Sequence, residues 1–337
     1  MRLGVIGYGY WGPNLVRNFV DAPGAQVAAV SDLRPERLER VARAYPTIRT
    51  TTDHRELLTA TDIDAIAIAT PVSTHHELGM AALRAGKHVL IEKPLAAKAH
   101  EAEELVNEAA KRNLVLLVDH TFAYTGAVRK MRELVQSGAL GPIDYYDSTR
   151  VNLGLFQHDV SVLWDLAVHD LSIMSYVLDQ HPIAVSAIGK SHVAGQPENI
   201  AYLTLLYESN LIAHVNVNWL SPVKIRRTII GGKNKMVVYD DLEPSEKVKV
   251  YDSGLTLTDD PKQIYQMLIG YRTGDIWSPK LETVEALQAE ARHFVDCIEN
   301  GAKPITGGAA ALEVVRILEA ASRSMAQRGA MVELERA

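Results

Sequence analysis

The sequence predicts an α/β protein in which a doubly wound parallel sheet is followed by a second α+β domain with an open, mostly antiparallel sheet. Three observations support this prediction. Up to about residue 119, short apolar runs alternate with amphipathic helical segments. A Gly-x-Gly-x-x-Gly pattern separates the first apolar run from the first helical segment. After residue 120, several segments of strand character follow one another without helices between them, which is typical of antiparallel pairing.

The first domain is predicted to span residues 1–119. Its apolar runs are the expected strands, and runs that are apolar on both faces suit a parallel sheet covered by helices on both sides. Pro13 stands where a first helical turn tolerates a missing N–H, and Leu15 and Phe19 share one face of that helix. The expected strands are residues 3–7, 26–32, 64–70, 88–94 and 114–120, and the expected helices are residues 13–20, 34–45, 73–86 and 99–113.

The second domain is predicted to span residues 120–337. Alternating polar and apolar residues indicate strands with one buried face. Residues 207–210 (Tyr-Glu-Ser-Asn) are typical of a hairpin turn between two of these strands. The expected strands are residues 143–152, 185–193, 199–207, 211–219, 224–232, 235–240 and 247–252, and the expected helices lie within residues 127–138, 161–178, 281–301 and 309–329.

Composition excludes several classes of protein. The chain has 337 residues, and its net charge of −6 without a basic stripe argues against a nucleic-acid partner. Cys297 is the sole cysteine, so an intrachain disulfide and a cysteine-based zinc site are excluded. No apolar run reaches the roughly 18 residues that a membrane span needs. From these features and the absence of a leader-like start, we expect a soluble cytoplasmic protein.

The glycine pattern predicts a dinucleotide site. Gly7, Gly9 and Gly12 follow a strand and open a helix, where backbone N–H groups receive a pyrophosphate. Asp32 closes the second strand, where a carboxylate binds the adenosine ribose. This carboxylate favours NAD over NADP, although Arg34 stands close enough to soften the preference.

Other strand ends add candidate contacts to the cofactor, because ligands of such sheets bind outside the carboxyl ends of the strands. The adjacent pair His75 and His76 does not predict a metal site, because neighbouring side chains on a helix point in different directions. The additional cofactor candidates are Tyr10, Trp11, Thr70, Pro71, His75, Glu92 and Lys93.

Two features indicate acid–base chemistry. Lys93 ends an apolar strand before Pro94, and a cis Lys–Pro bond would aim its ammonium group into the cofactor crevice. Asp165, His169, Ser172 and Tyr176 recur at helical spacing and form a polar stripe on an otherwise apolar helix. Asp165, one turn before His169, would orient or polarise the imidazole for proton transfer. The alternatives are a solvated surface lysine and a hydrogen-bonded core histidine.

The chain resembles the Gfo/Idh/MocA oxidoreductases along nearly its whole length. The resemblance is carried by "GVIGYGYWG", "VSD", "ATPVSTHHE", "GKHVLIEKPLA" and "WDLAVHD". It implies a Rossmann domain followed by an open-sheet domain that often assembles into dimers or tetramers, with hydride transfer between a nicotinamide and a sugar carbon. It also implies that Lys93 binds the reacting oxygen, that His169 is the acid/base, and that Asp165 is its nearby carboxylate.

Further segments resemble the branch that acts on nucleotide-linked sugars, which includes UDP-N-acetylglucosamine and UDP-N-acetylglucosaminuronate 3-dehydrogenases. They are "GYGYWGPNLVRNF", "HTFAYTGAVRK", "RVNLGLFQ", "LWDLAVHDLSI" and "YRTGDIW". The resemblance implies a nucleotide-sugar substrate oxidised at C3. The additional substrate candidates are His120, Tyr124, Arg150, Asn152 and Arg272.

Two alternative functions remain at this stage. The first is an NADP-dependent ketoreductase that reduces a 3-keto nucleotide deoxysugar, against which Asp32 argues. The second is a non-enzymatic regulator that senses a nicotinamide or a sugar, against which the retained Lys93 and His169 argue, because a sensor needs no acid–base pair.

Overall fold

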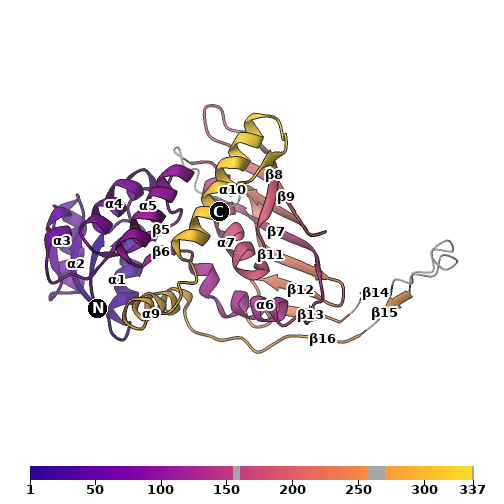
Figure 1. Cartoon of the computed structure of the whole chain (residues 1–337), viewed down its shortest axis with the longest axis horizontal. Coiled ribbons are helices and arrows are strands. Elements are labelled where there is room, and N and C mark those ends of the chain that lie inside the picture. Colours follow the sequence, from indigo (N-terminus) through magenta and orange to yellow (C-terminus); the bar gives the residue numbers. More distant parts are fainter. Residues whose placement is uncertain (155–159, 253, 257–269, 273, 336–337) are drawn as a thin grey trace. The chain divides into compact units, whose positions relative to one another are not determined.

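The computed structural model describes residues 1–154, 160–252, 254–256, 270–272 and 274–335 (Figure 1). The chain forms two compact units. The first contains Met1–Thr125 together with Thr283–Glu319, and the second contains Gly126–Glu282 together with the segment that starts at Ala320.

The first unit is built on a six-stranded sheet in the order β3-β2-β1-β4-β5-β6, with every pair parallel. The order reverses between β1 and β4, which is the point where doubly wound sheets bind their ligands. This sheet confirms the predicted fold class. The strands are β1 (Arg2–Ile6), β2 (Gln26–Ser31), β3 (Arg49–Thr51), β4 (Ala65–Ile68), β5 (His88–Glu92) and β6 (Leu116–Asp119).

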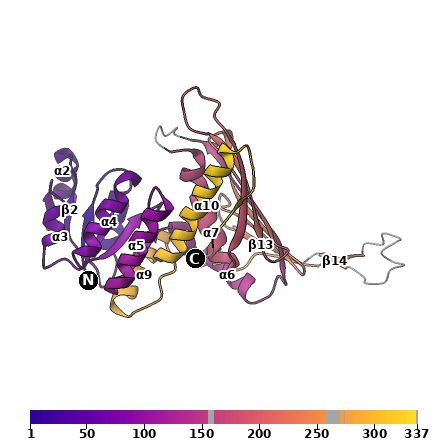
Figure 2. The ribbon, with the colours of Figure 1, turned by 45° about the horizontal axis from the view of Figure 1, so that its top comes forward.

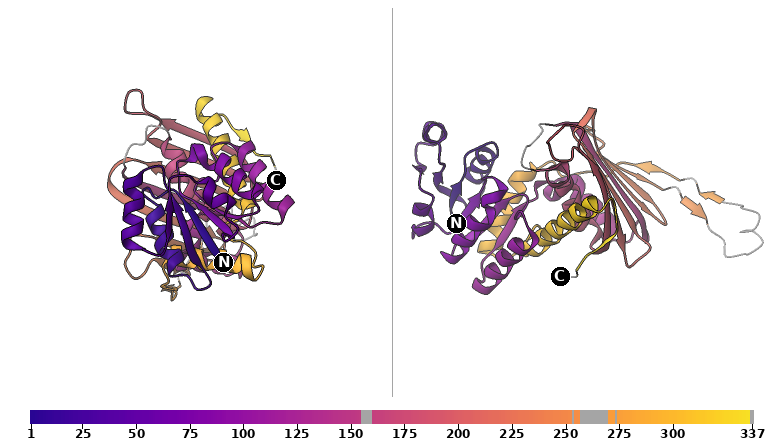
Figure 3. Two further views of the ribbon diagram at one scale, coloured as in Figure 1. Left: turned by 90° about the vertical axis from the view of Figure 1, so that its left-hand side faces the viewer. Right: turned by 90° about the horizontal axis from the view of Figure 1, so that it is seen from above.

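Helices cover this sheet in two groups. α1 packs against α9, and α4 packs against α5, as expected for helices on opposite faces (Figure 3). In α1 the apolar stripe of Leu15, Val16 and Phe19 is fully buried. The helices of this unit are α1 (Gly12–Val20), α2 (Pro35–Ala44), α3 (Arg55–Thr59), α4 (His75–Arg84), α5 (Ala99–Arg112) and α9 (Ala286–Glu299), with short 3₁₀ turns η1 (Val72–Thr74) and η2 (Thr121–Tyr124).

The position of α9 differs from the sequence expectation of one boundary near residue 120. This helix lies far along the chain, yet it belongs to the first unit. The Phe294 ring meets the Phe19 ring edge to face, with centroids 6.0 Å apart. Leu287 and Ala291 are buried in the same cluster. Burial of apolar surface explains why α9 belongs to this unit, because the apolar face of α1 would be exposed to water without it.

The second unit is built on a nine-stranded sheet in the order β16-β13-β12-β11-β7-β10-β9-β8-β17. All pairs are antiparallel except β7 with β10. The hairpin expected at residues 207–210 joins β9 and β10. The strands are β7 (Ile143–Leu153), β8 (Pro182–Lys190), β9 (Ile200–Tyr207), β10 (Ile212–Asn218), β11 (Leu220–Gly232), β12 (Met236–Asp240), β13 (Val248–Tyr251), β16 (Ile276–Trp277) and β17 (Val332–Glu333).

The strands of this sheet bury alternate residues. In β9, Ala201, Leu203 and Leu205 are buried, whereas Tyr202 is 55% exposed. Helices α6 (Gly126–Gln136) and α7 (Val168–Leu178) lie along one face of the sheet (Figure 2). A separate two-stranded antiparallel sheet pairs β14 (Gly254–Thr256) with β15 (Gly270–Arg272). Helix α10 (Gly308–Ala326) begins in the first unit and ends in the second.

Candidate active site

The glycine loop has the form that a phosphate cradle requires. Gly7 has a φ of +97°, and a Cβ there would lie 2.6 Å from the Ala69 carbonyl oxygen. A Cβ on Gly12 would lie 2.2 Å from the Gly7 carbonyl oxygen. No other residue type fits either position without moving the backbone. The loop therefore holds its backbone close to the N-terminus of α1, where unpaired N–H groups favour an anion.

Asp32 lies directly after β2 and is bound to this loop. Its carboxylate accepts the backbone N–H of Tyr8 at 2.7 Å and that of Arg34 at 2.9 Å. Burial alone would raise the pKa of Asp32, but these hydrogen bonds and the Arg37 guanidinium at 3.1 Å outweigh it and lower the pKa. Asp32 is therefore a fixed anion directly after the second strand, a position from which doubly wound domains bind an adenosine ribose.

Arg37 was not singled out from the sequence. It lies in the first turn of α2 and pairs with Asp32, and its guanidinium lies 3.4 Å from the position a Cβ on Gly9 would take. Its spacing of five residues from Asp32 was the available signal. It places a second cation, besides Arg34, close to Asp32 and to the glycine loop.

His75 is fully buried between two strand ends. Its Nδ1 lies 2.8 Å from the Pro94 carbonyl oxygen, and its Nε2 lies 2.9 Å from that of Thr70. Burial lowers its pKa, so the neutral ring donates to one of the two carbonyls. In this structure the ring connects the loop after β4 to the loop after β5, and both of its nitrogens face backbone instead of open space.

The loop after β5 carries Lys93, whose bond to Pro94 is cis, as the sequence allowed. The Lys93 side chain is half-buried. Its ammonium charge acts on both Asp119 and His120, which follow β6 on the neighbouring strand. The carboxyl ends of β5 and β6 thus bring the predicted lysine together with the Asp–His pair.

His120 is 2% exposed, and neither ring nitrogen has a hydrogen-bond partner among the described residues. Burial first, and then the Lys93 charge, lower its pKa to about 3. The ring is therefore neutral at physiological pH and offers one donor and one acceptor. A buried, neutral imidazole whose two nitrogens have no partner within the described part of the chain can donate one hydrogen bond and accept another, as binding of a hydroxyl group requires.

Tyr124 lies in η2 and is 3% exposed. Its hydroxyl shares a hydrogen bond of 3.0 Å with the Thr306 hydroxyl, and its ring centroid lies 5.6 Å from that of His293 on α9. Burial raises the pKa of Tyr124 well above its ordinary value, so it stays protonated. These contacts place Tyr124 in the interior of the first unit.

The second unit carries the predicted acid–base helix. The chain makes a π-helical turn at Leu163–Ala167 and continues as α7. This turn changes the regular α-helical spacing that the sequence predicted between Asp165 and His169, and π turns often occur at functional sites. The Trp219 indole N–H donates to the Asp165 carboxylate at 3.2 Å.

The residues predicted to form one polar stripe on this helix make separate contacts in the structure. Ser172 is buried and donates its hydroxyl to the His169 carbonyl oxygen at 2.8 Å. Tyr176 has the Arg132 guanidinium over its ring, 4.4 Å from the centroid. Both side chains therefore stabilise the helix and its packing.

Arg150 on β7 is 4% exposed, and its Nε donates to the Asp170 carboxylate at 2.6 Å. The Ser148 hydroxyl donates to the other oxygen of Asp170. Because Asp170 follows His169 directly, this buried ion pair holds the first turn of α7 against the sheet. Asn152, near the end of β7, is half-buried. Arg272 belongs to β15, and its side chain lies outside the described part of the structure.

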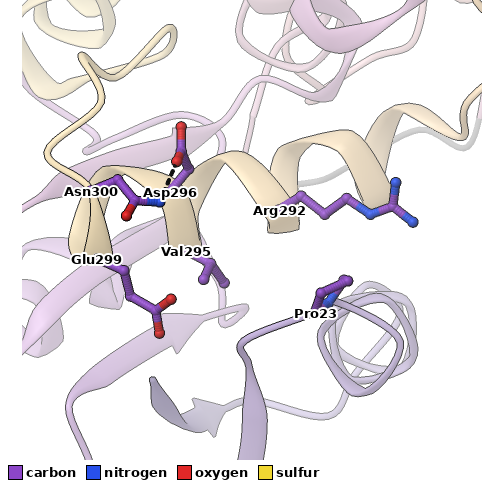
Figure 4. Close-up of a pocket in the computed structure, with 6 residues that line it drawn as sticks. All are labelled: Pro23, Arg292, Val295, Asp296, Glu299 and Asn300. Atoms are coloured by element: carbon purple, nitrogen blue, oxygen red, sulfur yellow. Dashed lines mark hydrogen bonds between the residues drawn. The ribbon is translucent and has the colours of Figure 1, made fainter.

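An open hollow lies elsewhere on the first unit (Figure 4). Arg292, Asp296 and Glu299 line it from α9, and Pro23 lines it from the turn before β2. That turn is at the amino ends of the strands, opposite the edge that carries the glycine loop. Within the described residues there is no cluster of metal-ligating side chains and no helix long and apolar enough to cross a membrane.

Sequence comparisons agree with this geometry. The profile of an oxidoreductase family with an NAD-binding Rossmann fold, Gfo/Idh/MocA, matches residues 1–120, and the profile of its C-terminal domain matches residues 128–238. The inositol 2-dehydrogenase of Rhodococcus erythropolis is 31% identical over 77% of this chain and 77% of its own length. The chain belongs to the Gfo/Idh/MocA oxidoreductase family. Its first unit contains the family's NAD-binding domain, so the NAD and oxidoreductase predictions are confirmed.

Two further similarities of this Gfo/Idh/MocA enzyme are to proteins named for a nucleotide sugar. The UDP-N-acetylglucosamine 3-dehydrogenase of Acidithiobacillus ferrooxidans is 33% identical over 61% of this chain and 63% of its own length. The solved structure of an Acidithiobacillus ferrooxidans protein of that name superposes with a TM-score of 0.81 at 26% identity, covering 97% of each chain. The relatives therefore include enzymes named for a nucleotide sugar and for a cyclic polyol.

Proposed function

We propose that this enzyme uses NAD to oxidise the C3 hydroxyl of a nucleotide-linked sugar, UDP-N-acetylglucosamine or its uronate, to the 3-keto sugar. The half-buried Lys93 beside the buried, neutral ring of His120 carries the proposal, because the cation and the two ring nitrogens, which are unpartnered among the described residues, can bind a hydroxyl group. The likeness to UDP-N-acetylglucosamine 3-dehydrogenase over 97% of both chains supports the choice of sugar.

The cofactor assignment follows from the loop and Asp32. The glycine loop would bind the pyrophosphate, and Asp32 would accept the ribose hydroxyls, joined by Tyr10, Trp11, Arg34, Thr70, Pro71 and Glu92. Bound NAD supplies the hydride acceptor. Because Asp32 is an anion, it disfavours a 2′-phosphate, although Arg37 moderates this effect. His75 acts indirectly, by holding the loops after β4 and β5.

The proposed roles in the reaction are divided among three residues. His169 takes the proton of the C3 hydroxyl, Lys93 binds and polarises the C3 oxygen, and Asp165 supports His169. The C3–H bond breaks with its electron pair leaving as hydride, and the C–O bond becomes a carbonyl. His120, Asn152 and Arg272 are the proposed further substrate contacts. Tyr124 is not among them, because Thr306 binds its buried hydroxyl in the interior of the first unit. The ion pair with Asp170 makes the contribution of Arg150 mainly the placement of α7.

A second candidate substrate is a cyclic polyol such as myo-inositol. The 31% identity to inositol 2-dehydrogenase over 77% of both chains favours it. The chemistry of the reacting carbon is the same, because a secondary alcohol becomes a ketone in both cases. The two candidate substrates differ in what is attached to the ring: a nucleotide in the first candidate and no further group in the second.

The proposal is tested by single-turnover kinetics. Enzyme at stoichiometric concentration is mixed with NAD and, in separate runs, UDP-N-acetylglucosamine, its uronate or myo-inositol, and the near-ultraviolet absorbance of NADH is followed. We expect a rise with a UDP sugar. His169→Ala should slow this rise by roughly 10²-fold or more, as loss of a general base does. NADH affinity should stay within about twofold, as for a group that acts in the chemical step.

The matched control is His100→Ala, because His100 is an exposed imidazole in the first turn of α5. It should leave the rate unchanged. A rise with myo-inositol alone would replace the proposed substrate with the second candidate. No rise with any of these substrates, but a fall in NADPH absorbance when a 3-keto sugar is added, would make the enzyme a ketoreductase. Binding of cofactor and sugar without turnover in either direction would indicate a sensor.

The proposal includes a homodimer or homotetramer in the cytoplasm. The nine-stranded sheet of the second unit exposes apolar side chains on several strands: Ile188, Tyr202, Ile212, Val223 and Ile225. An apolar sheet face of this kind suits association of identical chains.

A further inference from the structure

A buried polar network connects the glycine loop to helix α9. The Trp11 indole N–H donates to Oδ2 of Asp119, and the Thr121 hydroxyl donates to Oδ1. The Glu290 carboxyl group, which comes from α9, interacts with that of Asp119, and neither of its oxygens accepts a hydrogen bond from a donor among the described residues. Asp119 is 2% exposed and Glu290 is 0% exposed. Two carboxyl groups thus meet in the interior, directly behind the loop.

Charge decides how this pair shares its protons. Burial, Asp119 and the nearby Glu92 raise the pKa of Glu290 well above its ordinary value. Burial also raises the pKa of Asp119, but the hydrogen bonds from Thr121, Trp11 and Glu290 oppose this rise. The charge of the Lys93 ammonium group opposes it as well. Glu290 is therefore the group that keeps its proton, and Asp119 is the acceptor. Two adjacent carboxylates could not both be ionised without strong repulsion.

Glu290 stands out on its helix. It lies between Leu287 and Phe294 on the buried face of α9, where an apolar residue would be expected. A fully buried acid is costly unless it is neutral and hydrogen-bonded. Its position on that apolar face was the signal in the sequence.

We propose that Glu290 is a positioning residue for the glycine loop: its carboxyl group holds Asp119 in place to accept the indole N–H of Trp11, and so fixes the segment that receives the cofactor. The loop is then held at both ends by carboxylates, at Tyr8 by Asp32 and at Trp11 by Asp119. This inference rests on NAD binding by the loop and is independent of which sugar reacts.

The first test measures the loop directly, without cofactor. The full-length protein is labelled with ¹⁵N-tryptophan, which gives one indole signal for each of its four tryptophans. Trp11→Phe identifies the Trp11 signal by its disappearance. Glu290→Leu should shift or broaden that signal, whereas Glu290→Gln should leave it nearly in place, because the amide still donates to Asp119. Asp296→Asn is the control, since Asp296 is an exposed acid on the outer face of α9.

The second test measures NADH affinity in a double-mutant cycle. Glu290→Leu should weaken binding by roughly tenfold, and Glu290→Gln by no more than about twofold, since one hydrogen bond is lost in the first case only. In the Trp11→Phe background, Glu290→Leu should have little further effect, because interacting residues are not additive. Thermal unfolding of each variant separates loss of binding from loss of fold.

Three results would overturn the inference: an unchanged Trp11 signal in Glu290→Leu, equal defects in the Gln and Leu variants, or effects of Trp11→Phe and Glu290→Leu that multiply independently. Failure of the wild-type protein to bind NADH would instead contradict the cofactor assignment. The indole signals would then still decide the structural inference.

Discussion

At the scale of single residues, the first unit keeps a neutral imidazole in its interior. His120 is 2% exposed, and burial together with the Lys93 charge lowers its pKa to about 3 from an ordinary value of 6.5. In the unfolded chain the ring takes up a proton near pH 6.5, but the folded chain resists protonation until far lower pH. The unfolded state therefore binds more protons between these two values, and stability falls as pH falls through that window.

This difference predicts a pH-dependent stability that belongs to His120. Between pH 7 and pH 5 the wild-type protein should lose on the order of 2 kcal/mol of unfolding free energy through this residue. His120→Gln removes the titration and should flatten the profile by that amount. Urea unfolding at pH 7, 6 and 5 measures it, and parallel profiles for the two proteins would contradict the prediction.

Single residues also show where sequence reasoning succeeds. The glycine positions were predictable, because the positive φ of Gly7 and the close approach of Gly12 to the Gly7 carbonyl oxygen are local in the chain. The full burial of His75 between two carbonyls was not, because it depends on a proline 19 residues away. Glu290 was missed for the same reason, because its partner Asp119 comes from a distant element. Arg37 lies only five residues from Asp32, but that spacing alone does not show that the two side chains pair.

At the scale of elements, α9 completes the core of a unit whose strands β1–β6 and helices α1–α5 precede it by more than about 150 residues. Phe294 is fully buried against Phe19 of α1. Periodicity predicted this helix, because an apolar stripe is visible in one segment. It did not predict which unit the stripe faces. The elements β3 and α3 were missed because they have three and five residues, too few for a period to show.

The packing of α9 predicts a large effect of one substitution. Phe294→Ala should lower the unfolding free energy by roughly 3–5 kcal/mol, because it leaves a cavity beside Phe19. Arg292→Ala, on the exposed face of the same helix, should change it by less than about 0.5 kcal/mol. Urea unfolding followed by circular dichroism compares the two. A small effect at Phe294 would mean that α9 contributes little to the core.

At the scale of the whole molecule, the chain leaves the first unit after Thr125 and re-enters it at Thr283. The two crossings are neighbours in space, since a Cβ on Gly126 would lie 2.2 Å from the Glu282 carbonyl oxygen. The entire segment between them is thus an insertion with closely spaced ends, which sequence patterns do not reveal. An insertion of this kind predicts that the first unit folds without it.

That prediction is tested by rejoining the first unit. Residues 1–126 linked through a few Gly and Ser residues to residues 282–319 should unfold cooperatively and bind NADH, because Asp32, Trp11, Asp119 and Glu290 are all retained. Residues 1–125 alone lack α9, so the apolar face of α1 is exposed, and we expect neither a cooperative transition nor NADH binding. NADH fluorescence and urea unfolding distinguish the two proteins. Equal NADH binding by both would show that the returning segment is dispensable, and binding by neither would show that the cofactor unit depends on the insertion for its fold.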